Sequence, residues 1–179
     1  FNSIHGDIPE SIAKLCAQSK VKKFIHVSAI GASKDSKSKY QQSKFLGEEK
    51  ALNNFNKTVI IRPSVVIGNE DNFTNLFAKL SLSPIIPVVN VNYKFEPIFV
   101  NDVARAILKA IETKNNEGKI YELGGGRVIS FGDMIKLILS TIGKKRFVAD
   151  VPMTLAKIQS SLLSILPIDP IITKDQCLI

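Results

Sequence analysis

The chain has 179 residues, of which 45% are hydrophobic and 22% charged, and its net charge is +8. This composition is typical of a globular protein with one hydrophobic core and excludes a disordered chain. No run of about 18 apolar residues occurs, which excludes a transmembrane helix. The first residues, FNSIHGDIPE, lack the basic and apolar regions of a signal peptide.

The positive charge suits an anionic partner such as nucleic acid, lipid headgroups or a phosphorylated cofactor. The lysines are scattered and no basic stretch is interleaved with aromatic residues, so we expect no nucleic-acid surface. Cys16 and Cys177 have no metal-like spacing and favour a reducing compartment. His26 lies in an apolar run, where a hydrogen-bonded structural role is expected, and we predict no metal site.

Helices are predicted from apolar periodicity and from residues that favour helix ends. Asp7 suits the N-terminal cap of the first helix, and Asn101 suits that of a later one. Ser130 with Asp133 resembles a capping box, and Gly143 is expected to stop the helix that follows. The expected helices span residues 8–19, 40–53, 72–80, 101–113, 130–142 and 155–166.

Buried parallel strands are predicted at FIHVS (24–28), TVIIRPSVV (58–66) and KIYEL (119–123), which are short apolar runs. Pro63 cannot donate to a neighbouring strand, so the second strand should leave regular pairing there. The prolines of segment 82–100 exclude a long helix, and we expect this segment to be irregular. The alternation of strands and helices predicts an α/β fold with a parallel sheet.

One segment combines residues that carry chemistry. Ser28 ends a predicted strand, where open α/β sheets bind ligands, and could hydrogen-bond a substrate oxygen. Tyr40 and Lys44 are spaced to share one face of the next helix. A neighbouring ammonium lowers the pKa of a phenol, which would let Tyr40 act as acid or base in hydride transfer. Taken alone, the pair also fits an exposed helix that begins with a tyrosine.

Together, FIHVSAIGA, YQQSKFLGE, IIRPSVVIG, EPIFVNDVARAI and YELGGG resemble successive landmarks of atypical and extended short-chain dehydrogenase/reductase proteins. Within that family, the chain most resembles the dehydrogenase-like accessory subunit of respiratory complex I and its bacterial relatives. The resemblance implies the C-terminal part of a doubly wound parallel-sheet Rossmann fold with a small helical substrate-side region. Residues 1–145 would form a partial NAD(P)-binding domain, and residues 146–179 a C-terminal helical segment.

The resemblance also implies roles for individual positions. Ser28, Tyr40 and Lys44 match the family's catalytic residues, and Lys44 would also hold the nicotinamide ribose of NADP or NAD. The run Gly124 to Gly126 lacks the spacing of a phosphate-binding loop and is expected to be a flexible strand exit. The cofactor-binding residues expected from the resemblance are Val27, Ser28, Tyr40, Lys44, Pro63, Ser64 and Val65.

The sequence departs from the family pattern at its beginning. The Gly-rich turn that binds the cofactor pyrophosphate, and the acidic residue that reads the ribose, do not precede Tyr40 here. We therefore expect an N-terminally truncated domain that lacks most of the cofactor anchoring. The ending, ITKDQCLI, suggests a truncation there as well. An incomplete parallel sheet exposes an apolar edge, which predicts low stability or poor solubility.

Three functions are open at this point. The first is a non-catalytic, cofactor-holding subunit or assembly factor related to respiratory complex I. Its partners would be complex I subunits, and its location the cytoplasm or the inner membrane periphery, on the matrix side in a eukaryote. The second is an active NAD(P)-dependent oxidoreductase, or a nucleotide-sugar epimerase or dehydratase. The third is a fragment without a function of its own.

Overall fold

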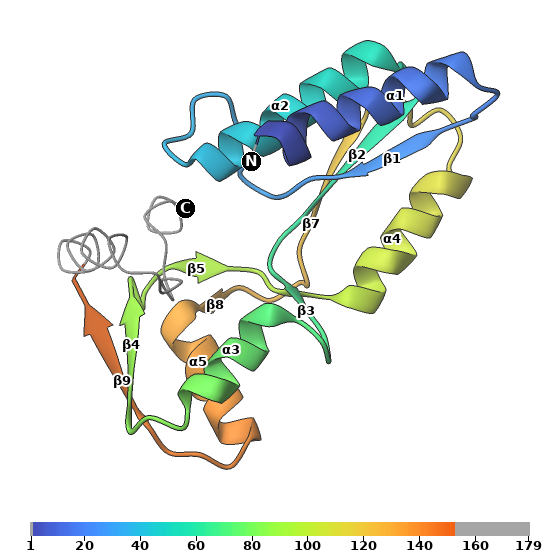
Figure 1. Ribbon diagram of the computed structural model, residues 1–179. Helices are drawn as coiled ribbons and strands as arrows, with labels where there is room; N and C mark the ends of the chain where they lie inside the picture. The colour runs from blue at the N-terminus through green and yellow to red at the C-terminus, as the bar shows by residue number, and fades with distance from the viewer. Residues whose placement is uncertain (1, 153–179) are drawn as a thin grey trace. The chain divides into compact units, whose positions relative to one another are not determined.

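A computed structural model describes residues 2–152 (Figure 1). The described residues form two compact units, one from residues 2–64 and 98–125 and the other from residues 65–97 and 126–152. The helix predicted at residues 155–166 lies outside the described residues, as does Cys177.

The first unit is built on a parallel sheet of β1 (Phe24–Val27), β2 (Thr58–Pro63) and β7 (Ile120–Leu123), in the order β1-β2-β7. These are the three strands predicted from the sequence, and β2 ends at Pro63 as expected. Central β2 is buried over its first four residues because both of its faces are covered. The predicted α/β fold with a parallel sheet is confirmed.

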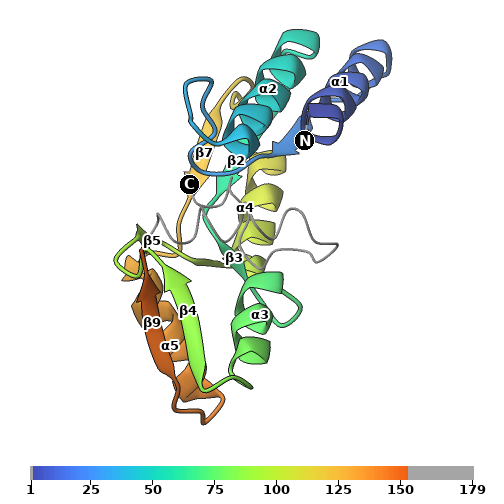
Figure 2. The same ribbon diagram turned by 60° about the vertical axis from the view of Figure 1, so that its left-hand side comes forward.

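Helices cover both faces of this sheet (Figures 1 and 2). On one face lie α1 (Ile8–Gln18) and α2 (Lys39–Asn54), and on the other lies α4 (Val100–Glu112), which follows the short strand β6 (Ile98–Phe99). One core cluster joins α1 and α2 through Ala13, Ala51 and Phe55. A second joins α4 to the sheet and contains Val59, Ile61 and Ala110.

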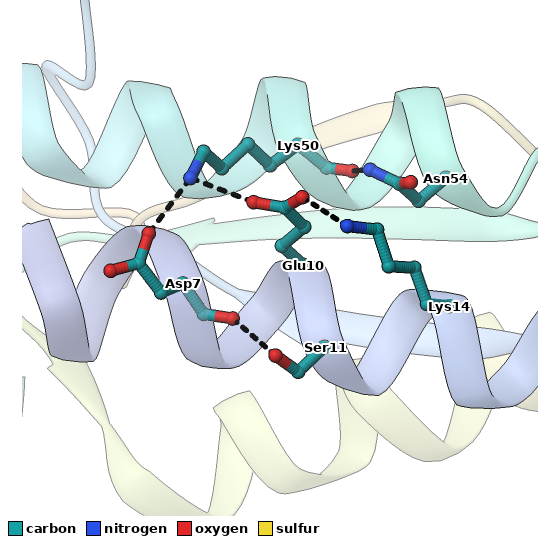
Figure 3. Close-up of polar contacts among 6 residues, drawn as sticks. All are labelled: Asp7, Glu10, Ser11, Lys14, Lys50 and Asn54. Carbon is teal, nitrogen blue, oxygen red and sulfur yellow. Dashed lines mark hydrogen bonds and ion pairs between the residues drawn. The ribbon is translucent and has the colours of Figure 1, made fainter.

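The predicted caps of α1 and α4 are wrong. A short π-helix, η1 (Ser3–Asp7), runs directly into α1, so Asp7 has helical dihedral angles and makes no side-chain cap. Its carboxylate instead accepts from Lys50 Nζ at 2.8 Å, and Lys50 also pairs with Glu10 at 2.7 Å, which links α1 to α2 (Figure 3). The helix α4 begins one residue before Asn101, and its N-cap, Phe99, has no side-chain hydrogen bond.

The side chain of Lys23, which is distant in sequence, caps the C-terminal end of α4. Lys23, which precedes β1, donates from Nζ to the carbonyl oxygens of Ala110 at 3.0 Å and Thr113 at 2.6 Å. The same ammonium donates to Asn116 Oδ1 at 2.6 Å. The last carbonyls of a helix lack partners within the helix and carry partial negative charge, so a cation stabilises them. Lys23 thereby fixes α4 against the sheet edge that carries β1.

The second unit contains β3 (Val66–Ile67), α3 (Asn72–Leu80), β4 (Ile85–Val89), β5 (Lys94–Phe95), β8 (Ile129–Ser130), α5 (Phe131–Thr141) and β9 (Phe147–Val151). Ser130 caps α5 by accepting from the amide of Asp133 at 3.1 Å, as predicted, and Gly143 follows α5 with a φ of 68°. Asp71 caps α3 in the same way, through the amide of Thr74 at 2.6 Å.

Segment 82–100 is not irregular, which corrects the prediction. Within it, β4 pairs in parallel with β9, and β5 pairs antiparallel with β8. Pro87 lies inside β4, opposite Ala149. A strand of a two-stranded sheet has one open edge, so a residue without an amide hydrogen is tolerated there. Buried side chains of β4 and α5 form the core of this unit, including Ile86, Val88, Ile135 and Leu139.

Candidate functional site

Ser28 lies at the carboxyl end of β1. Its amide donates to the carbonyl of Ile61 at 2.7 Å, which continues the pairing of β1 with β2. The residue is 4% exposed, and its Oγ is buried without a hydrogen-bond partner among the described residues. A buried hydroxyl without a partner in the protein costs free energy.

Tyr40 and Lys44 lie on successive turns at the start of α2, as predicted. Ser38 caps this helix, with its Oγ accepting from the amide of Gln41 at 3.3 Å. The cap sets the first turn, and Lys44 Nζ lies 5.9 Å from the centre of the Tyr40 ring. This distance is within the range of a cation–π interaction. The two side chains are therefore neighbours rather than separate features of an exposed helix.

The loop between β1 and α2 is folded back onto the start of α2. Gly31 has a φ of 84°, and a Cβ at that position would lie 2.3 Å from Gln41 Nε2. The positive φ favours glycine here, and a Cβ would require the Gln41 side chain to move. Ser36 Oγ also accepts from the amide of Ser38 at 3.0 Å. These contacts hold the loop that follows β1 against the N-terminal turn of α2.

Burial decides the protonation of the Tyr40–Lys44 pair. Loss of solvent raises the pKa of Tyr40 above 10.0, which is opposite to the lowering that the sequence predicted. Burial also lowers the pKa of Lys44, and Glu48 partly offsets that effect. The pKa of Tyr40 rises because the cost of desolvating the phenolate is larger than its stabilisation by the neighbouring ammonium. At neutral pH Tyr40 is a neutral phenol, which can donate a hydrogen bond or a proton.

An ion pair that the sequence analysis missed lies one turn further along α2. Glu48 is 2% exposed and accepts two hydrogen bonds from Arg62 of β2, at 2.9 Å from Nε and 2.7 Å from Nη2. Arg62 also contacts Glu122 of β7 at 3.2 Å. The hydrogen bonds that Arg62 donates to Glu48 raise the pKa of the guanidinium above its usual value. The sequence does contain an indication of this ion pair, because an arginine inside an apolar strand needs an acidic partner when it is buried.

Two histidines lie near Lys44. His26 is on β1, two residues before Ser28, and burial followed by the charge of Lys44 lowers its pKa to about 4. Its Nε2 is buried without a partner among residues 2–152, so the expected hydrogen bond is missing at this atom. His5, on η1, has its ring centre 5.4 Å from that of Tyr40. The sequence analysis assigned no role to His5.

The remaining predicted cofactor residues follow β1 and β2. Pro63 ends β2, and its carbonyl accepts from the amide of Ile30 at 3.1 Å. The amide of Ser64 donates to the carbonyl of Leu123 at 2.9 Å, and Val27 is 41% exposed. The structure thus gathers Val27, Ser28, Pro63 and Ser64 at the carboxyl edge of one parallel sheet. Val65 belongs to the other compact unit.

Two general features complete the description of residues 2–152. They contain no group of three or more His, Cys, Asp or Glu residues placed to hold a metal ion. None of their helices is both long and apolar enough to cross a membrane.

Comparison with known families identifies the chain. The RmlD substrate binding domain family matches residues 2–164. The chain belongs to this family. The match covers most of the sequence, and the resemblance to short-chain dehydrogenase/reductase proteins is confirmed.

The relatives of this RmlD-family chain include complex I subunits. NADH dehydrogenase [ubiquinone] 1 alpha subcomplex subunit 9, mitochondrial, of Dictyostelium discoideum is 37% identical over 120 residues, which cover 66% of this chain and 34% of the relative. The Mus musculus protein of the same name is 30% identical over 178 residues, which cover 98% of this chain and 47% of the relative. The chain therefore spans less than half the length of these two relatives.

Solved structures share the fold at low sequence identity. dTDP-4-dehydrorhamnose reductase from Bacillus anthracis, in complex with NADP, has a TM-score of 0.68 at 21% identity, covering 82% of this chain and 57% of that one. UDP-glucuronic acid 4-epimerase from Bacillus cereus, in complex with UDP-glucuronic acid and NAD, has a TM-score of 0.67 at 21% identity, covering 82% and 54%. These likenesses establish the Rossmann-like fold.

Proposed function

We propose that this RmlD-family chain holds the nicotinamide side of an NAD(P) cofactor and serves as a cofactor-holding subunit or assembly factor related to complex I. The observation that carries the proposal is the Ser28 hydroxyl, which is buried at the sheet edge without a partner among the described residues, in the same compact unit as the half-buried Tyr40 and Lys44. Such an orphaned polar atom fits a polar ligand group at the carboxyl ends of parallel strands, where this architecture binds ligands.

In this proposal each residue has a simple role. The Lys44 ammonium donates to the hydroxyls of the nicotinamide ribose, and the Ser28 and Tyr40 hydroxyls bind polar atoms of the nicotinamide side. Pro63 and Ser64 contact the same end of the cofactor. Bound NAD(P) would supply a hydride donor or acceptor.

A holding role is favoured over turnover by two observations. Burial raises the pKa of Tyr40, so the phenol is not activated as a base in this structure. The relatives with the higher identity are named as complex I subunits, whereas the named reductases and epimerases are similar in fold. Complex I subunits are accordingly the proposed partners, and the mitochondrial matrix side of the inner membrane the proposed location in a eukaryote.

Active reduction or epimerisation is the second candidate. It is favoured by the complete set of Ser28, Tyr40 and Lys44, all of which an acid–base mechanism would use. The two candidates share the same cofactor site and differ only in whether Tyr40 transfers a proton during turnover.

The test is a titration of the ¹⁵N-labelled chain with NADPH, NADH and nicotinamide mononucleotide, followed by NMR. This method detects binding in the millimolar range. We expect saturable shifts confined to the amides around Ser28, Tyr40, Lys44 and Ser64. Lys44→Met should abolish them because it removes the ammonium and keeps the stem. Lys109→Met is the matched control, since Lys109 is exposed on α4. Absence of saturable shifts with all three probes would refute the proposal.

A further inference from the structure

His5 contacts Tyr40 through its ring. The two ring centres are 5.4 Å apart and the ring planes meet at 84°, which is an edge-to-face arrangement. Aromatic rings prefer this geometry because the positive edge of one ring meets the negative face of the other. The contact restricts the orientation of the phenol ring that the proposed cofactor site uses.

A hydroxyl joins His5 to the backbone of the same tyrosine. Ser43 Oγ donates to the carbonyl of Tyr40 at 2.7 Å and lies 2.9 Å from His5 Nδ1. A serine hydroxyl has one proton, and the carbonyl takes it. His5 Nδ1 must therefore be the donor to Ser43, which places the hydrogen of the neutral ring on Nδ1 and the lone pair on Nε2.

The neutral form of His5 agrees with its surroundings. Burial lowers its pKa, and the charge of Lys44 lowers it further. The titratable groups that act on His5 are Tyr40 and Lys44 on α2, His26 on β1 and the amino terminus of the chain, whose charge also lowers the pKa of His5. An uncharged imidazole beside Lys44 avoids a second buried cation close to the phenol.

The backbone around His5 is built for this contact. η1 is a π-helix, a rare conformation that often marks functional positions. Its close packing on α2 depends on Gly47, where a Cβ would lie 1.9 Å from the carbonyl oxygen of His5. The glycine lets the two backbones approach and so brings the imidazole to Tyr40.

We propose that His5 is a positioning residue for Tyr40. Its ring fixes the orientation of the phenol, and its Nδ1–H, through Ser43, fixes the first turn of α2. This inference rests on the proposed role of Tyr40 at the cofactor site. His5 acts through Tyr40 and is not itself assigned a contact with the cofactor.

The test uses the full chain labelled with ¹³Cζ-tyrosine. Tyr40→Phe assigns the Tyr40 signal among those of the three tyrosines. As the pH falls below 6.5, protonation of His5 places a cation at the ring edge, so the Tyr40 signal should show a step. His26, whose pKa is about 4, gives a separate event at lower pH. His5→Phe keeps the aromatic bulk and should remove the first step.

Ser43→Ala is the second variant, and it should lower the pKa of His5 and so move the step toward lower pH, because the imidazolium loses a hydrogen-bond acceptor. It removes the hydroxyl that accepts from His5 Nδ1 and leaves the ring contact. A step that persists unchanged in His5→Phe, or the lack of any step in the unmodified chain, would overturn the proposal.

A second readout connects His5 to the cofactor. In His5→Phe, the affinity for NADPH should fall by roughly two- to tenfold, the range expected when one hydrogen bond is lost and an aromatic contact changes. An unchanged affinity would overturn the positioning role. If the unmodified chain shows the His5 step and no NADPH binding at all, the proposed function fails while the contact between His5 and Tyr40 stands.

Discussion

Glu48 and Arg62 form a bidentate ion pair that ties α2 to the central strand of the sheet. The carboxylate is 2% exposed and the arginine side chain 15%, and the hydrogen bonds measure 2.9 and 2.7 Å. The fork geometry of arginine matches both carboxylate oxygens. Because Glu48 lies one turn after Lys44, the pair also sets how the helix that carries Tyr40 and Lys44 lies on β2.

Replacing Glu48 should lower the free energy of unfolding. Glu48→Gln leaves the largely buried Arg62 charge with only the exposed Glu122 as an anionic partner, and breaking a buried pair in this way typically costs about 3–5 kcal/mol of the free energy of unfolding. Urea denaturation measures this loss. Glu122→Gln is the matched control, since Glu122 is 57% exposed and contacts the same guanidinium. We expect the control to cost less than about 1 kcal/mol. Equal losses for the two variants would contradict the prediction.

Gly47→Ala should destabilise the contact between η1 and α2. Alanine is favoured over glycine inside a helix by about 1 kcal/mol. Here its Cβ would lie 1.9 Å from the carbonyl oxygen of His5, a backbone atom that cannot rotate away. We expect a net loss of about 1–3 kcal/mol in the free energy of unfolding. Gly6→Ala is the control at the same interface, because its Cβ would meet the flexible side chain of Leu46 at 3.1 Å. A neutral Gly47→Ala would contradict this account.

Stability should fall as the pH drops from 6.5 toward 4.5 because of His26. The pKa of this residue is about 4 in the folded chain and 6.5 as a reference for the unfolded chain. In this window the unfolded chain binds a proton that the folded chain does not, so protonation favours unfolding. The loss should reach about 2–3 kcal/mol at pH 4.5.

Thermal melts across this pH range measure the effect. His26→Gln cannot take up the proton and should have a flatter dependence on pH between 6.5 and 4.5. His5, whose pKa is also lowered, contributes in the same direction to the slope that remains. An unchanged slope in His26→Gln would show that His26 is not the group responsible.

Tyr40→Phe distinguishes a holding role from turnover. Loss of one hydroxyl leaves the ring contact with His5 in place, so we expect the fold to persist and NADPH affinity to change by less than about tenfold. No NADPH-dependent reduction of carbonyl compounds should be measurable in either form. Turnover by the unmodified chain that falls by orders of magnitude in Tyr40→Phe would favour the enzyme instead.

Local sequence predicted the elements that carry the site. The three strands of the first sheet are short apolar runs, and their boundaries agree with the structure to within a few residues. The spacing of Tyr40 and Lys44 placed them on one face of α2, because helical geometry depends on the backbone alone. Ser130 was correctly predicted to cap α5, since a capping bond joins residues close in sequence.

Predictions failed where distant segments meet. Asp7 was predicted to cap α1, but η1 precedes α1 directly and gives Asp7 helical dihedral angles. η1 packs on α2 at Gly47, which is distant in sequence. Segment 82–100 was predicted to be irregular because the partner strand of β4 is β9, which lies about 60 residues later in the chain. No local pattern encodes such a pairing, and the prolines of the segment excluded only a long helix.

The sequence alone determined which residues could form the site: a serine that ends a buried strand, and a tyrosine and a lysine on the next helix, within landmarks that resemble one family. Only the tertiary structure decided their surroundings. It buried Tyr40 enough to raise its pKa, brought His5 against its ring, and placed the Glu48–Arg62 pair beneath α2. Burial and charge pairing depend on chain segments far apart in sequence, so the chemical character of these residues follows from the fold.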